Sequence, residues 1–224
     1  MPDSSYVAAI TPTEADEQLL WRDESELVVG ANPDRLRQFA AGRLGARQIF
    51  GQLGIESGPL LAARDGTPLW PQGIRGSIAH KPKLCVVVAA SIHTWSGVGV
   101  DLEVLAPLPA PVWTRVLVGA ERKALRSGRT GKIEARVIFS AKEAYYKWYK
   151  SLGHGGEPRF TDIHVMLDGN HIRAVPMVSG RFPAMSGVWI SEGGHVIALG
   201  WSGQSVVHAE ACATTPEPFR LSSD

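Results

Sequence analysis

The sequence predicts an α+β protein built from two similar halves. Two long segments, 34–53 and 133–152, carry apolar side chains at helical spacing, and each precedes short runs rich in β-branched residues. A proline-rich break at 107–111 lies between the two patterns. The chain has 224 residues, a length between one and two typical domains. We therefore expect each half to be a helix packed on antiparallel strands.

The first helix is predicted to begin after Asn32-Pro33, a capping residue followed by proline at the first helical position. Its apolar stripe consists of Leu36, Phe39, Ala46, Ile49, Phe50 and Leu53. Arg35 and Arg43 fall on this apolar side or at its edge. Because a buried charge is costly, each of these arginines must be paired or must face a cleft.

The remaining elements of the first half follow a glycine- and proline-rich stretch at 58–76, which indicates a loop. Strands are expected at 77–79, 84–92 and 97–103. In the second half, a short helix is expected from about 120 to 127, ahead of the long helix at 133–152. The later strands are predicted at 161–167, 171–175, 187–191 and 195–201, with hairpin turns at 168–170 and 192–194.

The predicted organisation has four parts. They are a flexible N-terminus at 1–18, a first half at 19–106, a second half at 107–202 and a flexible tail at 203–224. The two ends are polar or rich in small residues, which is why little order is expected there.

Composition excludes several classes of protein. The formal net charge of +1 argues against a protein that coats nucleic acid or an anionic membrane. Two cysteines, Cys85 and Cys212, make neither a disulfide framework nor a zinc cluster. The N-terminus lacks the pattern of a secretory signal, and the longest apolar run, 84–90, is too short to span a bilayer. The expected compartment is the cytoplasm.

Two acidic residues stand close together at the end of a predicted strand. Side chains alternate along a strand, so Asp101 and Glu103 point to the same face. Two neighbouring carboxylates repel each other unless a positive charge lies between them, and Mg²⁺ suits a site of carboxylates and a phosphate. Two exposed acids at a strand end are the alternative.

Two further segments carry polar residues of the same kind. Glu143 and Lys147, in the run 139–147, are four residues apart on a helix. One interpretation is a solvated ion pair. The other is that Glu143 is a metal ligand or base and Lys147 binds phosphate. His80 ends the segment 76–80, where it is either a surface residue or a phosphate contact through its ring N–H.

In this order and spacing, the three segments resemble the 4′-phosphopantetheinyl transferases of the monomeric type that includes the surfactin and enterobactin synthetase activators. The matching motifs are Gly76-Ser77-Ile78-Ala79-His80, Gly99-Val100-Asp101-Leu102-Glu103 and Phe139-Ser140-Ala141-Lys142-Glu143-Ala144-Tyr145-Tyr146-Lys147. A fourth is the arginine pattern from Arg35 through Arg43 to Arg47, and Phe160 also stands where the family places it. The resemblance covers about residues 32–201 and implies two halves related by a pseudo-twofold, with the active site between them.

Two positions depart from the family pattern. Ala79 replaces a residue that usually carries a hydroxyl, which removes one side-chain phosphate contact and leaves only the backbone N–H. Upstream, near Gly66, relatives often carry a basic residue, and Arg64 is the candidate here.

The resemblance implies that the protein moves the 4′-phosphopantetheine arm of coenzyme A onto a serine of a carrier protein and releases 3′,5′-adenosine bisphosphate. By carry-over, Mg²⁺ is held by Asp101, Glu103 and Glu143. Glu143, directly or through a metal-bound water, removes the serine proton, and Lys147 stabilises charge on the leaving phosphate. The residues that the resemblance places on coenzyme A are Arg35, Arg43, Arg64, Ala79, His80, Asp101, Lys142 and Lys147.

The implied partners are acyl or peptidyl carrier domains of polyketide, nonribosomal peptide (including siderophore) or fatty-acid synthases, with no nucleic acid and no membrane, and the protein is expected to be a monomer. The candidate docking surface is the segment 107–131, with Trp113, Arg115, Val116, Leu117, Arg122, Lys123, Arg126 and Arg129. Two other functions remain open. One is a Mg²⁺-dependent nuclease that uses the same acids and lysine, and the other is a catalytically weak paralogue that only binds carrier proteins.

Overall fold

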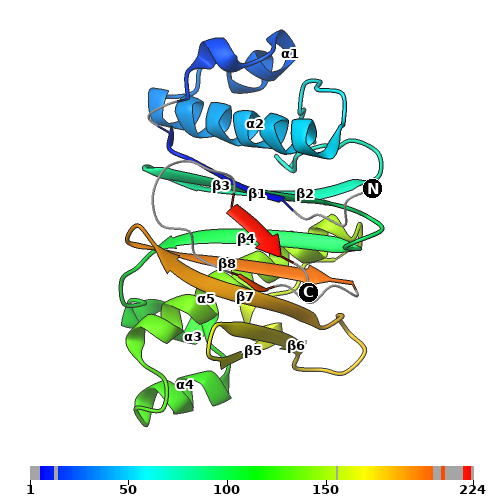
Figure 1. The fold of residues 1–224 in the computed structure, drawn as a ribbon. Coiled ribbons are helices and arrows are strands. Elements are labelled where there is room, and N and C mark those ends of the chain that lie inside the picture. The colour runs from blue at the N-terminus through cyan, green and yellow to red at the C-terminus, as the bar shows by residue number, and fades with distance from the viewer. Residues whose placement is uncertain (1–5, 13–14, 155, 204–207, 210–218, 223–224) are drawn as a thin grey trace. The chain divides into compact units, whose positions relative to one another are not determined.

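The computed structural model describes residues 6–12, 15–154, 156–203, 208–209 and 219–222. It divides the chain into two compact units, Met1–Ser96 with Gly203–Asp224, and Gly97–Ser202. Each unit holds one long helix against an antiparallel sheet, which confirms the predicted α+β class (Figure 1).

The first unit contains a five-stranded sheet in the order β2-β3-β1-β10-β9. Its strands are β1 (Tyr6–Ile10), β2 (Ile74–Lys81), β3 (Leu84–Ser91), β9 (His208–Ala209) and β10 (Phe219–Ser222). Its helices are η2 (Glu17–Leu19), α1 (Arg22–Ser25), η3 (Glu26–Val28) and α2 (Pro33–Leu53).

Helix α2 begins and ends as its sequence predicts. The Asn32 side chain accepts a hydrogen bond from the backbone N–H of Arg35, and Gly54 ends the helix in the left-handed conformation at φ 67°. The helix packs on β1 and β3. Gly45 permits this close approach, since a Cβ there would lie 2.7 Å from the Val87 side chain.

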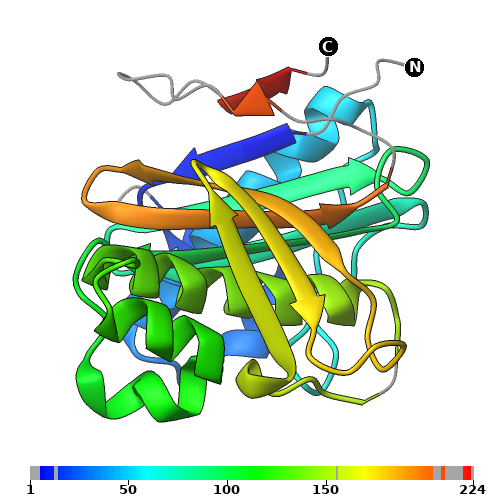
Figure 2. The same cartoon turned by 90° about the horizontal axis from the view of Figure 1, so that it is seen from below.

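The second unit contains the sheet β4-β8-β7-β6-β5. Its strands are β4 (Gly97–Val104), β5 (Ile163–Asp168), β6 (His171–Pro176), β7 (Met185–Glu192) and β8 (His195–Ser202). Its helices are η4 (Ala110–Val112), α3 (Trp113–Val116), α4 (Gly119–Arg126), α5 (Lys132–Ser151) and η5 (Phe160–Asp162). Helix α5 lies along this sheet (Figure 2) and packs mainly on β4 and β8.

The contact between α5 and β4 depends on one glycine. A Cβ at Gly99 would lie 2.1 Å from the Ala144 carbonyl oxygen and 2.4 Å from the Trp148 backbone nitrogen. Because backbone atoms cannot move aside as a flexible side chain can, any larger residue at 99 would push the helix off the strand. The buried faces of Tyr145 and Trp148 continue the core of this unit.

Three expectations are corrected. Residues Tyr6–Ile10, which the sequence analysis placed in a flexible N-terminus, form β1 and pair with β3 along their whole length, because Tyr-Val-Ala-Ala-Ile is a good strand sequence. Strand β4, assigned to the first half, pairs with β8 and belongs to the second compact unit, so that unit begins at Gly97 and not after the prolines. Helix α3 was not predicted.

Of the predicted flexible tail, residues 204–207, 210–218 and 223–224 lie outside the described residues, while β9 and β10 lie within them. Among the helices described by the structure, none is long and apolar enough to cross a membrane.

Candidate active site

The acid pair on β4 is covered by the polar face of α5. Lys147 donates from Nζ to Asp101 Oδ1 (2.9 Å) and to the Val100 carbonyl oxygen (2.9 Å). Ser140 donates from Oγ to Asp101 Oδ2 (2.9 Å). The Asp101 residue is only 7% exposed, so the alternative of two exposed acids does not hold.

Glu103 is held by a second cation of the same helix. Arg136 Nη1 lies 3.1 Å from Glu103 Oε2, and its other nitrogens donate to the carbonyl oxygens of Ala106 and Pro107. Arg136 therefore ties α5 both to the end of β4 and to the first residues of the proline-rich segment. Positions 136, 140, 143 and 147 share one face of the helix because they are three or four residues apart.

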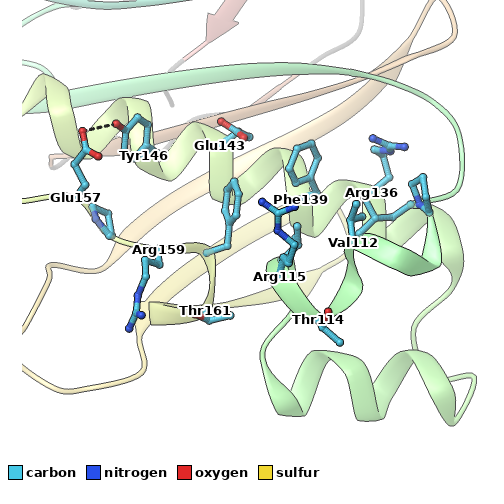
Figure 3. Close-up of a pocket in the computed structure, with 15 residues that line it drawn as sticks. Val112, Thr114, Arg115, Arg136, Phe139, Glu143, Tyr146, Glu157, Arg159 and Thr161 are labelled. Carbon is cyan, nitrogen blue, oxygen red and sulfur yellow. Dashed lines mark hydrogen bonds between the residues drawn. The ribbon is translucent and has the colours of Figure 1, made fainter. Parts of the chain in front are cut away.

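Glu143, half-buried on this face, also lines a groove of about 970 Å³ in the second unit. Figure 3 shows Phe139, Glu143 and Tyr146 projecting from α5, with Arg115 and Arg159 on facing segments. Tyr146 donates its hydroxyl to Glu157 Oε1 (2.8 Å). Apart from these charged and polar groups, the lining is mostly apolar, from Leu108, Pro109, Val112, Val116, Pro158 and Phe160.

The donor chemistry of this face suits a hard divalent cation, because carboxylate oxygens are available from β4 and from α5. Among the residues that the structure describes, no three acidic, histidine or cysteine side chains gather closely enough to hold a metal ion. The cations Lys147 and Arg136 are held by Asp101 and Glu103. A bound Mg²⁺ would compete with them for these two carboxylates.

Lys142, expected to contact phosphate, is instead buried inside the second unit with 2% exposure. Its ammonium donates to Glu121 Oε2 (2.7 Å), to the Val116 carbonyl oxygen (2.8 Å) and to the Phe160 carbonyl oxygen (3.0 Å). These bonds use all three N–H groups of a lysine, which leaves none for a ligand. Burial lowers the pKa of Lys142, and Glu121 opposes that shift.

The predicted docking segment is also partly core. Val116 and Leu117 are buried, and the Trp113 indole N–H donates to the Leu108 carbonyl oxygen (2.9 Å). Arg115 is exposed at the groove. The apolar surface available in this region is therefore the groove itself.

In the first unit, the structure brings together two of the predicted phosphate contacts. Arg35 Nη1, on α2, lies 2.9 Å from His80 Nε2, on β2. Because a guanidinium only donates, Nε2 of His80 accepts here, which assigns its proton to Nδ1. Strand β2 is at the edge of its sheet, and β3 is its one neighbour among the strands that the structure describes.

Arg43 lies two helical turns from Arg35 and is 5% exposed. Its guanidinium lies 3.5 Å from the centre of the Phe39 ring, and Nε donates to the Leu60 carbonyl oxygen (3.1 Å). Its Nη2 is buried without a hydrogen-bond partner. Burial lowers the pKa of Arg43 to about 10, a shift that Glu24 opposes, so the group stays charged at neutral pH. A buried charged donor with an open valence suits an anion.

Arg47, Arg64 and Ala79, the other first-unit residues of the family motifs, have different surroundings. Arg47 pairs with the fully buried Glu24 (2.8 Å), which also accepts from the backbone N–H of Leu60, so Arg47 holds the N-terminal segment on α2. Arg64 is exposed in the loop before β2. The Ala79 methyl group is buried, so only its backbone is left for a phosphate contact.

Sequence reasoning missed Ser140, Arg136 and Glu121 as partners of the predicted site residues. Ser140 and Arg136 have a sequence signal, since they share a helix face with Glu143 and Lys147. Glu121 has none, because its partner Lys142 is 21 positions away.

Comparison with known proteins agrees with the geometry of both units. A model of the 4′-phosphopantetheinyl transferase N-terminal domain matches residues 23–90, and one of the 4′-phosphopantetheinyl transferase superfamily matches 97–199.

Individual relatives carry the same name. The chain is 33% identical over 189 residues to the 4′-phosphopantetheinyl transferase Svp of Streptomyces mobaraensis, covering 80% of this chain and 77% of the relative. It is 26% identical over 228 residues to the 4′-phosphopantetheinyl transferase PptT of Mycobacterium tuberculosis, covering 88% and 98%. It is 28% identical over 135 residues to enterobactin synthase component D of Salmonella typhi, covering 59% and 56%. The chain belongs to the 4′-phosphopantetheinyl transferase family and is a transferase of this type.

Proposed function

We propose that the protein transfers 4′-phosphopantetheine from coenzyme A to a serine of an acyl or peptidyl carrier domain, with Mg²⁺, and releases 3′,5′-adenosine bisphosphate. The observation that carries the proposal is the position of Glu143. It lines an apolar groove from the helix face whose neighbours, Ser140 and Lys147, hold the buried Asp101. An acid at this place lines the groove proposed for the substrate and lies on the helix face that covers the β4 carboxylates.

In this reaction the serine Oγ attacks the phosphorus next to the pantetheine arm. A new P–O bond forms, the pyrophosphate P–O bond breaks, and 3′,5′-adenosine bisphosphate leaves with the electron pair. Glu143 takes the serine proton, directly or through a water molecule. Lys147, beside Asp101, stabilises the charge that develops on the leaving phosphate. Asp101, Glu103 and Glu143 would hold Mg²⁺, which would neutralise charge on the pyrophosphate.

We assign the remaining phosphate of coenzyme A, the 3′-phosphate, to the first unit. Arg35 and His80 form one donor pair, and Arg43 offers a buried guanidinium with an unfilled N–H. An arginine fork fits a phosphate dianion better than a lysine does, because its two parallel N–H groups match two oxygens. The 3′-phosphate is the group that this cluster is proposed to bind, with Arg64 and the Ala79 backbone as nearby candidates.

The acceptor is proposed to enter the groove. Its apolar lining with Arg115 and Arg159 at the edge is proposed to bind a carrier domain through an apolar patch with an acidic rim. Which synthase supplies the carrier, the cytoplasmic location and the monomeric state stay predictions.

The deciding experiment is mass spectrometry of an apo carrier protein incubated with this chain, coenzyme A and Mg²⁺. We expect a gain of one phosphopantetheine, about 340 Da from the composition of the group. Glu143→Gln keeps the shape of the side chain but removes the base, and is expected to lower the turnover rate by about 10²–10⁴-fold. Lys132→Met, an exposed position on the same helix, is the matched control and should behave as wild type.

Absence of any mass gain with several carriers would overturn the proposal and favour a paralogue that only binds carriers. Family membership weighs against the nuclease alternative. DNA cleavage that needs Mg²⁺ and disappears in Glu143→Gln would restore it.

A further inference from the structure

The buried ammonium of Lys142 contacts two segments that line the groove. Lys142 stands next to Glu143 on α5, yet its ammonium points into the second unit, where it contacts two segments far apart in sequence. One bond goes to the carbonyl oxygen of Val116 at the end of α3, and the other goes to that of Phe160 at the start of η5. Val116 and Phe160 both line the groove that Glu143 also lines. One ammonium therefore holds two lining segments of the groove on the helix that carries Glu143.

The carboxylate of Glu121, which pairs with the Lys142 ammonium, also contacts these two segments. Glu121 Oε2 accepts from Lys142 and from the Val118 backbone N–H (2.7 Å), and Oε1 accepts from the Val165 backbone N–H (2.8 Å). Val118 follows α3 and Val165 lies in β5 just beyond η5. The carboxylate thus binds the same two segments as the ammonium. Glu121 accepts from their backbone N–H groups, whereas Lys142 donates to their carbonyl oxygens. Glu121 is 3% exposed, so the pair is shielded from water.

We propose that the Lys142–Glu121 pair is a positioning element that sets the spacing of the groove lining and so places the acceptor substrate against Glu143. This inference rests on the proposed function of the groove as the acceptor site. A buried pair is a poor source of stability, because the desolvation of two charges offsets their attraction. Its five hydrogen bonds are directional, however, and they fix where the Val116 and Phe160 segments lie relative to α5.

The test uses the double variant Lys142→Met with Glu121→Gln, because changing one partner alone would leave a buried uncompensated charge. Both replacements nearly keep the side-chain shapes. The KM for the carrier protein is expected to rise about tenfold or more, which corresponds to about 1.4 kcal/mol. The KM for coenzyme A is expected to change less than about twofold, because the cations assigned to its 3′-phosphate lie in the first unit. Lys132→Met, exposed on α5, is the matched control.

Hydrogen exchange measured by mass spectrometry gives a readout that does not need activity. In the double variant, amides of residues 113–118 and 159–165 should exchange faster, while those of β4 stay as protected as in the wild type. Unchanged exchange in both segments would overturn the positioning role. Faster exchange with an unchanged KM for the carrier would also overturn it, because the lining would move without affecting the acceptor. If the wild-type chain transfers nothing, the proposed function fails, and the exchange comparison still decides whether the pair holds these segments.

Discussion

The two units differ in how their charged side chains are paired. On the polar face of α5 in the second unit, the cations Lys147 and Arg136 lie against the carboxylates Asp101 and Glu103. In the first unit, the Arg43 guanidinium is buried with one nitrogen lacking any partner, and Arg35 donates to a neutral histidine nitrogen.

This difference separates two tasks. Around Arg43, Glu24 supplies one negative charge against the positive charges of Arg35 and Arg47, so the cluster keeps a positive potential for a bound anion. A face of paired acids and cations has little net charge, and each group can exchange its partner during a reaction. We therefore assign affinity for the phosphates to the first unit and the chemical step to the second.

The largest expected effect is on the second unit's acid. Asp101→Asn keeps the shape but removes the charge that Lys147 and Ser140 hold, and is expected to lower kcat by about 10²–10³-fold. Binding of 3′,5′-adenosine bisphosphate in the absence of Mg²⁺, measured by calorimetry, should change little, because its 3′-phosphate is assigned to the first unit. Asp168→Asn, an exposed acid of the same unit, is the control. Full activity in Asp101→Asn would show that the metal and acid assignments are wrong.

A smaller effect is expected from a substitution in the first unit, and it should change the KM for coenzyme A rather than kcat. Arg43→Lys keeps the charge but loses the fork and the stacking on Phe39, so the KM for coenzyme A should rise about 10–100-fold with kcat nearly unchanged. Arg37→Lys, exposed on α2, is the matched control.

The substrate 3′-dephospho-coenzyme A identifies the phosphate that Arg43 binds. Wild type and Arg43→Lys should have similar KM values for this substrate, because the group that distinguishes them is missing. An equal loss with both substrates would mean that Arg43 is structural and does not bind the 3′-phosphate.

The smallest effect is expected at Asp162, which pairs with Arg159, a residue that lines the groove. Burial tends to raise the pKa of Asp162, but the backbone N–H and guanidinium of Arg159 outweigh this, with help from Arg181, so the pKa lies below its ordinary value of 3.8. A carboxylate with a lowered folded pKa stabilises the fold above its unfolded pKa and loses that contribution as pH falls through the folded pKa. Asp162→Asn should therefore melt slightly below wild type at pH 7, and the difference should close as the pH falls through the folded pKa of Asp162. A gap in melting temperature that persists at low pH would contradict this assignment.

Much of the architecture follows from local patterns. The cap at Asn32 with Pro33 and the apolar stripe through Leu53 predict α2 nearly to the residue, since both signals are local. The hairpins of β5 to β8 are likewise marked by their glycine turns. Strand β1 and the partner of β4 were not predicted correctly, because these strand pairs join segments at least 75 residues apart along the chain.

The candidate site was likewise predicted only in part from the sequence. The resemblance of three motifs to the family, in their order and spacing, pointed to Asp101, Glu143 and Lys147. Alternation on a strand and the i, i+4 relation on a helix placed their side chains on one face but left exposed acids and a solvated ion pair open. Lys142 shows the limit of that reasoning. Its motif position favoured a phosphate contact, but the folded chain surrounds it with Glu121, Val116 and Phe160.

The sequence by itself determined the α+β class, the two long helices, the acid pair on one strand face and the family to which these motifs belong. Only the tertiary structure decided which charges are paired, that Arg43 is buried with an open donor and that Lys142 is internal. The physical reason is that periodicity reports which side of an element a residue occupies. Burial and hydrogen bonding depend on what another segment brings to that side, and this is settled by packing between elements distant in sequence.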